Sequence, residues 1–168
     1  MATRTLAILI FDDVEVLDFC GPFEVFSVAN RFTDPPAFEV MTVAEKAGPV
    51  VTRGGLGVNP HHRLADCPQP DLLLVPGGQG TRKGMHDPAL IEWIGQASEK
   101  AELVLSVCTG ALLLAKAGLL DGLGATMHHG AIDLLRERRL QGPRFTPTAA
   151  SWTTGGWSAR RGPLRGST

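Results

Sequence analysis

Short apolar runs recur along most of the chain and predict strands. Residues 5–11 and 71–75 are almost wholly apolar, as strands buried on both faces of a parallel sheet are. Residues 38–43 and 103–105 have a similar composition, and residues 49–58, with apolar segments around a glycine turn, predict a hairpin. We therefore expect a sheet whose central strands are covered on both sides.

Segments with apolar residues at helical spacing lie between and after these strands. The first follows a Gly-Pro pair at 21–22, and the second begins with Asp-Pro, a typical helix start. The predicted helices cover residues 23–29, 87–98, 110–115 and 128–135, with a short strand at residues 125–127. Strands that alternate with helices indicate an α/β fold with a doubly wound, mainly parallel sheet.

The composition is that of an ordinary soluble globular domain, with 168 residues, 43% apolar and 20% charged. No run approaches the length of a membrane span and no signal-peptide pattern opens the chain, so we expect a cytoplasmic protein without a membrane partner. Cys20, Cys67 and Cys108 are too scattered for a disulfide framework or a zinc cluster. His61 and His62 lack a third ligand, and we expect no metal and three free thiols.

The net charge of −1 conceals an uneven distribution. Residues 1–135 hold nine Lys/Arg against sixteen Asp/Glu, whereas residues 136–168 hold seven Arg and one Glu. A basic tail can indicate nucleic-acid binding, but this one has no Lys and no helical period, so we expect no nucleic-acid partner. We divide the chain into an α/β domain at 1–140 and an atypical tail, rich in Arg, Gly and Pro, at 141–168.

Cys108 lies where the strand at 103–105 must turn into the helix at 110–115. A side chain at such an elbow projects from the carboxyl edge of the sheet toward a helix N-terminus, which favours a thiolate and lowers the cysteine pKa. Thr109 offers a backbone N–H and a hydroxyl to a reacting atom. A buried, inert cysteine is the alternative, and the small Gly110, which lets the helix approach closely, favours the elbow.

Other polar or glycine-rich positions also follow strands. Asp18 follows the first strand, Gly77 and Gly78 lie in the Pro-Gly-Gly-Gln-Gly turn after residues 71–75, and His128 follows the last short strand. Ligands of doubly wound sheets bind at this carboxyl edge, so we expect these loops to converge. From the residues alone, Asp18 could instead cap a helix that begins near Phe19, and His128 is either a neighbour of the nucleophile or a helix cap.

Six short motifs, in order along residues 5–135, carry a family resemblance. They are Val-Leu-Asp at 16–18 with Gly-Pro at 21–22, Ala-Asp-Cys-Pro at 65–68, Val-Pro-Gly-Gly at 75–78, Ser-Val-Cys-Thr-Gly at 106–110, Ala-Gly-Leu-Leu at 117–120 and Ala-Thr-Met-His at 125–128. Together they resemble the ThiJ/PfpI superfamily, which has the class I glutamine amidotransferase-like fold, and within it most closely the isonitrile (isocyanide) hydratases.

The resemblance implies a flavodoxin-like three-layer α/β/α sandwich, usually homodimeric, that acts on a small molecule. It implies Cys108 as nucleophile and Asp18 as its acidic partner, with Gly77, Gly78 and Gly110 near the substrate. Peptidase-type members carry a histidine where this chain has Thr109, so a Cys-His peptidase is not expected.

Such a pair can perform covalent catalysis on an isonitrile. The Cys108 thiolate would attack the terminal carbon, and a protonated Asp18, its pKa raised by burial, would deliver the proton that this carbon needs. Water would then hydrolyse the thioimidate to an N-substituted formamide. We therefore expect a hydro-lyase that needs no metal or organic cofactor.

The end of the chain departs from the family pattern. Family members continue with a strand, a small-residue loop and a covering helix, but residues 144–168 predict no strand and no helix. A shifted reading frame across residues 151–162 would restore a strand-like segment, so we interpret the tail as read out of frame. A smaller departure is Thr-Met-His-His at 126–129, where the family often has Thr-Thr-His-Trp.

Three other functions use the same residues. A glyoxalase or deglycase of this superfamily would share Cys108, although its acidic partner is more often Glu than Asp. The fold also forms the sensing half of AraC-type regulators, whose helix-turn-helix half we do not find here. In a redox-responsive protein, Cys108 would be oxidised rather than catalytic.

Overall fold

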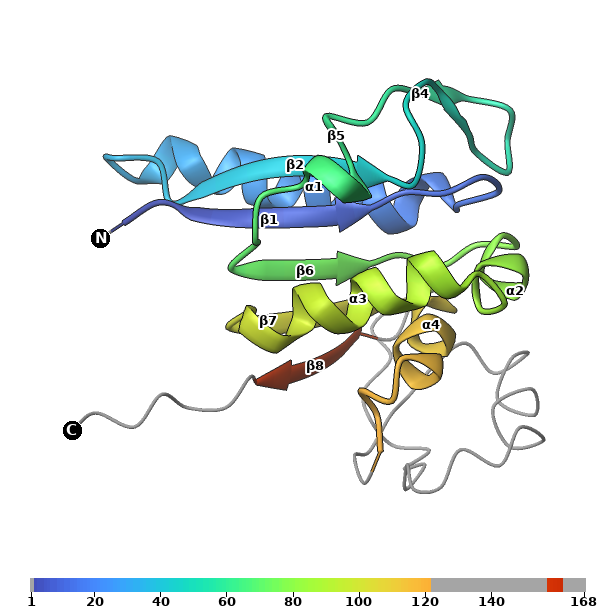
Figure 1. Ribbon diagram of the computed structural model, residues 1–168. Coiled ribbons are helices and arrows are strands. Elements are labelled where there is room, and N and C mark those ends of the chain that lie inside the picture. Colours follow the sequence, from blue (N-terminus) through green and yellow to red (C-terminus); the bar gives the residue numbers. More distant parts are fainter. Residues whose placement is uncertain (1, 122–156, 162–168) are drawn as a thin grey trace.

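In the computed structural model, which describes residues 2–121 and 157–161, a six-stranded sheet runs through the molecule in the order β5-β2-β1-β6-β7-β8 (Figure 1). The strands are β1 (Arg4–Leu9), β2 (Phe38–Ala44), β5 (His62–Arg63), β6 (Leu72–Val75), β7 (Leu103–Val107) and β8 (Trp157–Arg161). All neighbours pair in parallel except β7 and β8. The β1–β2 register runs from Arg4 opposite Phe38 to Leu9 opposite Val43.

Helices cover both faces of this sheet. They are α1 (Val16–Ala29), α2 (Thr81–Gly84), α3 (Pro88–Lys100) and α4 (Gly110–Lys116), with 3-10 turns at Asn30–Phe32 and Leu64–Asp66. Helix α1 lies behind the sheet in Figure 1, while α3 and α4 lie in front of it. A separate antiparallel hairpin joins β3 (Val50–Val51) to β4 (Gly57–Val58). Within the described ranges, no helix has the length and apolarity to cross a bilayer.

Alternate side chains of β1 pack in two separate hydrophobic cores, one on each face of the sheet. Leu6 and Ile8 pack in the cluster that contains Phe19 of α1, while Ala7 and Leu9 pack in the cluster that contains Ile94 of α3. Because successive side chains of a strand point to opposite faces, a strand between two helical layers must be apolar at every position. The expected three-layer α/β/α sandwich with a mainly parallel sheet is therefore confirmed.

Helix α1 corrects one prediction. We expected a helix over residues 23–29, with Asp18 just before it, but the helix begins at Val16 and runs through Pro22. Proline removes one backbone donor and normally kinks a helix interior. Here Pro22 and Phe19 are both buried against the sheet, so tertiary packing outweighs the local signal. Asp18 consequently lies inside the first turn of α1 rather than ahead of the helix.

The tail corrects a second prediction, since Trp157–Arg161 forms strand β8 where none was expected. It pairs antiparallel with β7, from Leu103 opposite Arg161 to Val107 opposite Trp157. Ladder pairing with an existing strand edge uses backbone groups alone, which explains why local composition did not reveal it. The expected elements at 125–127 and 128–135 fall outside the described residues, and the out-of-frame interpretation stays a prediction.

The order of the strands creates an opening at one edge of the sheet. The chain leaves β1 for β2 on one side, whereas β6 continues to β7 on the other side. The loops after β1 and β6 therefore diverge, and ligands of doubly wound sheets bind at such switch points.

Candidate functional site

Cys108 occupies a strained elbow between β7 and α4. Its φ of 52° lies in the left-handed region, which residues other than glycine seldom adopt. A side chain on Gly110 would collide with the carbonyl oxygen of Val75 and would lie 2.9 Å from that of Pro76. The close approach expected at Gly110 is thus confirmed, and this packing holds Cys108 at the carboxyl edge of the sheet.

Asp18 reaches the elbow from the first turn of α1. Asp18 is 9% exposed, and its carboxyl group accepts the Gly77 N–H at 3.2 Å and lies close enough to the Cys108 thiol for each group to shift the pKa of the other. The N-cap of α1 is Glu15, so the alternative in which Asp18 caps the helix is wrong. The carboxyl group instead faces inward, where three chain segments meet.

The glycine turn after β6 fills the space between α1 and the elbow. A methyl group on Gly77 would lie 2.6 Å from the Thr109 nitrogen and 2.7 Å from Oδ2 of Asp18, so only glycine fits. Gly78 has a φ of 131° and pairs with Val14 in an isolated antiparallel bridge. The Gly77 carbonyl oxygen also accepts the Glu15 N–H at 3.0 Å, which fixes the turn against the start of α1.

Thr109 ties this turn to the elbow through its side chain. Its hydroxyl accepts the Gly78 N–H at 3.0 Å and donates to the Gly78 carbonyl oxygen at 3.2 Å. Thr81 adds a second hydroxyl, which donates to the same carbonyl oxygen at 2.8 Å. We expected the Thr109 hydroxyl and the glycine N–H groups to face substrate, but the hydroxyl bonds Gly78 and the Gly77 N–H bonds Asp18, so these groups support the site. Nothing in the local sequence around Thr81 distinguished it from a surface residue.

The pKa of the Cys108 thiol shifts in the direction opposite to the one we expected. Burial raises the pKa of Cys108, and the nearby Asp18 charge raises it further, against the lowering effect of the Thr109 N–H and hydroxyl. Burial also raises the pKa of Asp18, although its hydrogen bond from Gly77 opposes this. The expected lowering of the Cys108 pKa is therefore wrong, because half-burial and a carboxyl neighbour outweigh the helix terminus. The expected rise for Asp18 is confirmed.

The described residues that the sequence singled out for the site gather around this pair. The gathered residues are Asp18, Gly77, Gly78, Cys108, Thr109 and Gly110. His128 lies outside the described residues. Within the part of the chain that the structure describes, no group of three or more His, Cys, Asp or Glu side chains could hold a metal ion. The arrangement can perform thiol chemistry with an adjacent carboxyl group that exchanges a proton.

A protein-family model described as the DJ-1/PfpI family matches residues 4–145. Among curated proteins, an isonitrile hydratase from Pseudomonas putida is 37% identical over 130 residues, which make up 77% of this chain and 54% of that protein. The helix-turn-helix transcriptional regulator CdhR from Pseudomonas aeruginosa is 31% identical over 149 residues, or 82% of this chain and 44% of the regulator. The chain thus spans about half the length of each of these two relatives.

Solved structures share the fold. A ThiJ/PfpI family protein from Pseudomonas syringae superposes with a TM-score of 0.74 and 26% identity, covering 93% of this chain and 62% of that one. The DJ-1 protein of Schizosaccharomyces pombe superposes with a TM-score of 0.69 over 88% of this chain and 78% of that one, at 16% identity.

Proposed function

The chain belongs to the DJ-1/PfpI family, and from this premise we propose that it hydrates an isonitrile to an N-substituted formamide, with Cys108 as nucleophile and Asp18 as general acid and base. One observation carries the proposal: the buried Asp18 carboxyl group, held by the Gly77 N–H, lies beside the Cys108 thiol at a strained elbow. The identity of 37% with an isonitrile hydratase supports the choice of substrate class.

The first step joins sulfur to carbon. Because the pKa of Cys108 is raised, the thiol keeps its proton at rest, and Asp18 removes that proton as sulfur attacks the terminal isonitrile carbon. A new S–C bond forms while the carbon retains an electron pair. Asp18, now protonated and still close to the new bond, returns the proton to this carbon. The product is a thioimidate, and no net charge has been added to the buried site.

The second step releases the product. Asp18, again a carboxylate, removes a proton from a water molecule as the water oxygen adds to the thioimidate carbon. Asp18 gives this proton to the nitrogen. The C–S bond then breaks as the carbon–oxygen double bond forms, and the proton of the added hydroxyl returns to sulfur. One isonitrile and one water thus give one formamide, with no oxidant or cofactor. The carboxyl group must act as both base and acid, and a raised pKa brings it nearer to neutral pH, which suits both roles.

The remaining site residues support this pair. Gly77 positions the Asp18 carboxyl group through its N–H, and Thr109 holds the glycine turn. The Thr109 N–H lowers the pKa of Cys108 and would therefore stabilise sulfur as negative charge develops there. Gly110, at the start of α4, stays a candidate for contact with substrate.

A second candidate function is small-molecule sensing without turnover. Regulators of the helix-turn-helix type recur among the curated relatives, at 25–38% identity. In that case the region around Cys108 would bind a ligand, and Cys108 would not complete a reaction.

The test is incubation of the folded protein with an aryl isonitrile, with the formamide followed by chromatography. We expect turnover that disappears in Cys108→Ala and falls at least about a hundredfold in Asp18→Asn, the range lost with a general acid or base. Undiminished turnover in Cys108→Ala would refute the mechanism. If the wild-type protein binds the isonitrile but forms no formamide, the sensing function replaces it.

We also propose that the protein is a homodimer joined through the outer face of α1. Leu17 and Val25 are 77% and 66% exposed on this face, with Gly21, which has open space above it, midway between them. Val51 and Leu56 of the hairpin are also exposed, each at 51%. A second copy would cover these side chains. The three free thiols favour a reducing compartment, and we expect a cytoplasmic location.

A further inference from the structure

We propose that a cavity beside the carboxyl ends of β1 and β2, separate from Cys108, binds a small organic anion with a flat apolar body. The cavity has a volume of about 600 Å³, which is in the range typical of small-molecule sites. Neither Asp18 nor Cys108 nor Thr109 lines it. This inference is independent of the hydratase proposal, because the two sites share no lining residue.

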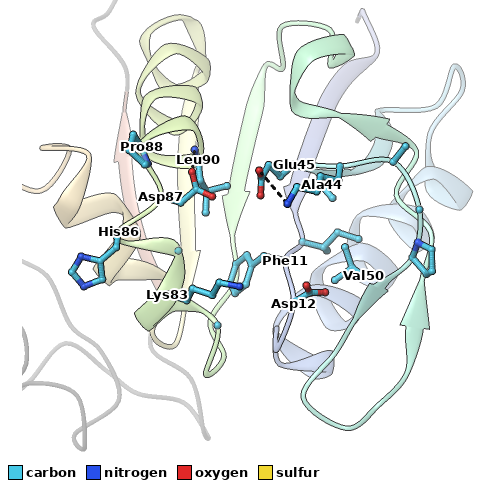
Figure 2. Close-up of a pocket in the computed structure, with 17 residues that line it drawn as sticks. Phe11, Asp12, Ala44, Glu45, Val50, Lys83, His86, Asp87, Pro88 and Leu90 are labelled. Carbon is cyan, nitrogen blue, oxygen red and sulfur yellow. Dashed lines mark hydrogen bonds and ion pairs between the residues drawn. The ribbon is translucent and has the colours of Figure 1, made fainter.

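The cavity is built from two sides that face each other across the sheet edge. Ile10 to Asp12 and the loop at 44–50 form one side, and α2 with the start of α3 forms the other (Figure 2). Its buried apolar lining comes from Ile10, Val50 and Leu90, none more than 7% exposed. An apolar floor of this kind stabilises a flat hydrocarbon body.

The negative side chains of the lining already have partners. Asp12 accepts the Val51 N–H at 3.0 Å, and Asp87 caps α3 by accepting the N–H groups of Ala89 and Leu90. Glu45 lies 3.8 Å from the ammonium of Lys46 (Figure 2). The three carboxylates keep their charge, so an anion would be held by direct contact with a lining ammonium rather than by the overall charge of the cavity.

Lys83 is the cation that remains for a ligand. None of the ion pairs found among the described residues involves it. Figure 2 shows its side chain directed from α2 toward Phe11, across the cavity, whereas the His86 ring points away. An ammonium above an apolar floor suits a carboxylate attached to an aromatic ring. The ammonium would bind the carboxylate, and the apolar lining would pack against the ring.

The test uses naphthalene-2-carboxylate as probe and ¹⁵N-labelled full-length protein. We expect saturable shifts of the backbone amide signals of residues 44–50 and 80–90. The neutral naphthalene-2-carboxamide should bind at least about tenfold more weakly, which is the size of one lost charge-assisted hydrogen bond. Lys83→Met should weaken carboxylate binding by a similar factor and leave carboxamide binding unchanged.

Two variants serve as controls. Arg82 is the exposed neighbour of Lys83 on α2 and does not line the cavity, so Arg82→Met should bind the carboxylate as the wild type does. Cys108→Ala should also bind normally, which separates this cavity from the thiol site. The proposal is overturned if the carboxylate causes no shifts, if the carboxamide binds equally well, if Lys83→Met has no more effect than Arg82→Met, or if Cys108→Ala abolishes binding.

Discussion

Replacing Thr109 by valine removes a single hydroxyl from a buried network while keeping the shape of the side chain. In the wild type this hydroxyl is the acceptor for the Gly78 N–H, and Thr109 is only 8% exposed. The variant leaves that N–H buried without its acceptor, which costs about 1–3 kcal/mol of unfolding free energy. The Gly78 carbonyl oxygen stays hydrogen-bonded in the variant, because the Thr81 hydroxyl and N–H still donate to it, at 2.8 and 3.3 Å.

Thr81→Val is the matched control. It also removes one buried hydroxyl, but every group that bonded this hydroxyl keeps another partner: the Gly78 oxygen retains the Thr109 hydroxyl, and the Thr109 oxygen retains the Gly78 N–H. Its cost should be that of an ordinary hydrogen bond, about 0.5–1.5 kcal/mol. Urea unfolding of both variants, at unchanged m-value, measures the difference. If Thr109→Val is no more destabilised than Thr81→Val, the Thr109 hydroxyl does not hold the glycine turn.

Two further predictions follow from the site and from α1. Because the Asp18 charge raises the pKa of Cys108, Asp18→Asn should lower that pKa. The midpoint of Cys108 alkylation by iodoacetamide should then move to lower pH. An unchanged or higher midpoint would contradict the assigned cause. Val25→Glu should convert the proposed dimer to a monomer in size-exclusion chromatography coupled to light scattering, while the neighbouring exposed Glu24→Gln should not; a monomeric wild type would exclude the dimer.

The strands and the elbow could be predicted because their signals are local. Apolar runs at 5–11 and 71–75 mark strands that are buried on both faces, and a helix-forming run directly after residues 103–107 places Cys108 at a turn. The convergence of Asp18 with the elbow followed from topology, since the carboxyl ends of parallel strands share one edge.

The remaining features depend on packing that a one-dimensional pattern does not contain. Pro22 marks a break locally, but its burial against the sheet keeps it inside α1. The pKa of Cys108 depends on how much protein surrounds the sulfur and on a carboxyl group ninety residues earlier in the chain. Thr81 acts in the site only because α2 brings its hydroxyl to the Gly78 carbonyl oxygen.

The left-handed backbone of Cys108 sets fold stability against reactivity at one position. A residue with a side chain gives up roughly 1–2 kcal/mol in this conformation, and glycine does not. Selection for a robust fold alone would therefore favour glycine at this position, and cysteine lowers the stability of the fold. Alanine at the same position keeps the backbone penalty, so Cys108→Ala changes the sulfur without changing this cost. Cys108→Gly would combine the loss of the sulfur with a gain in stability.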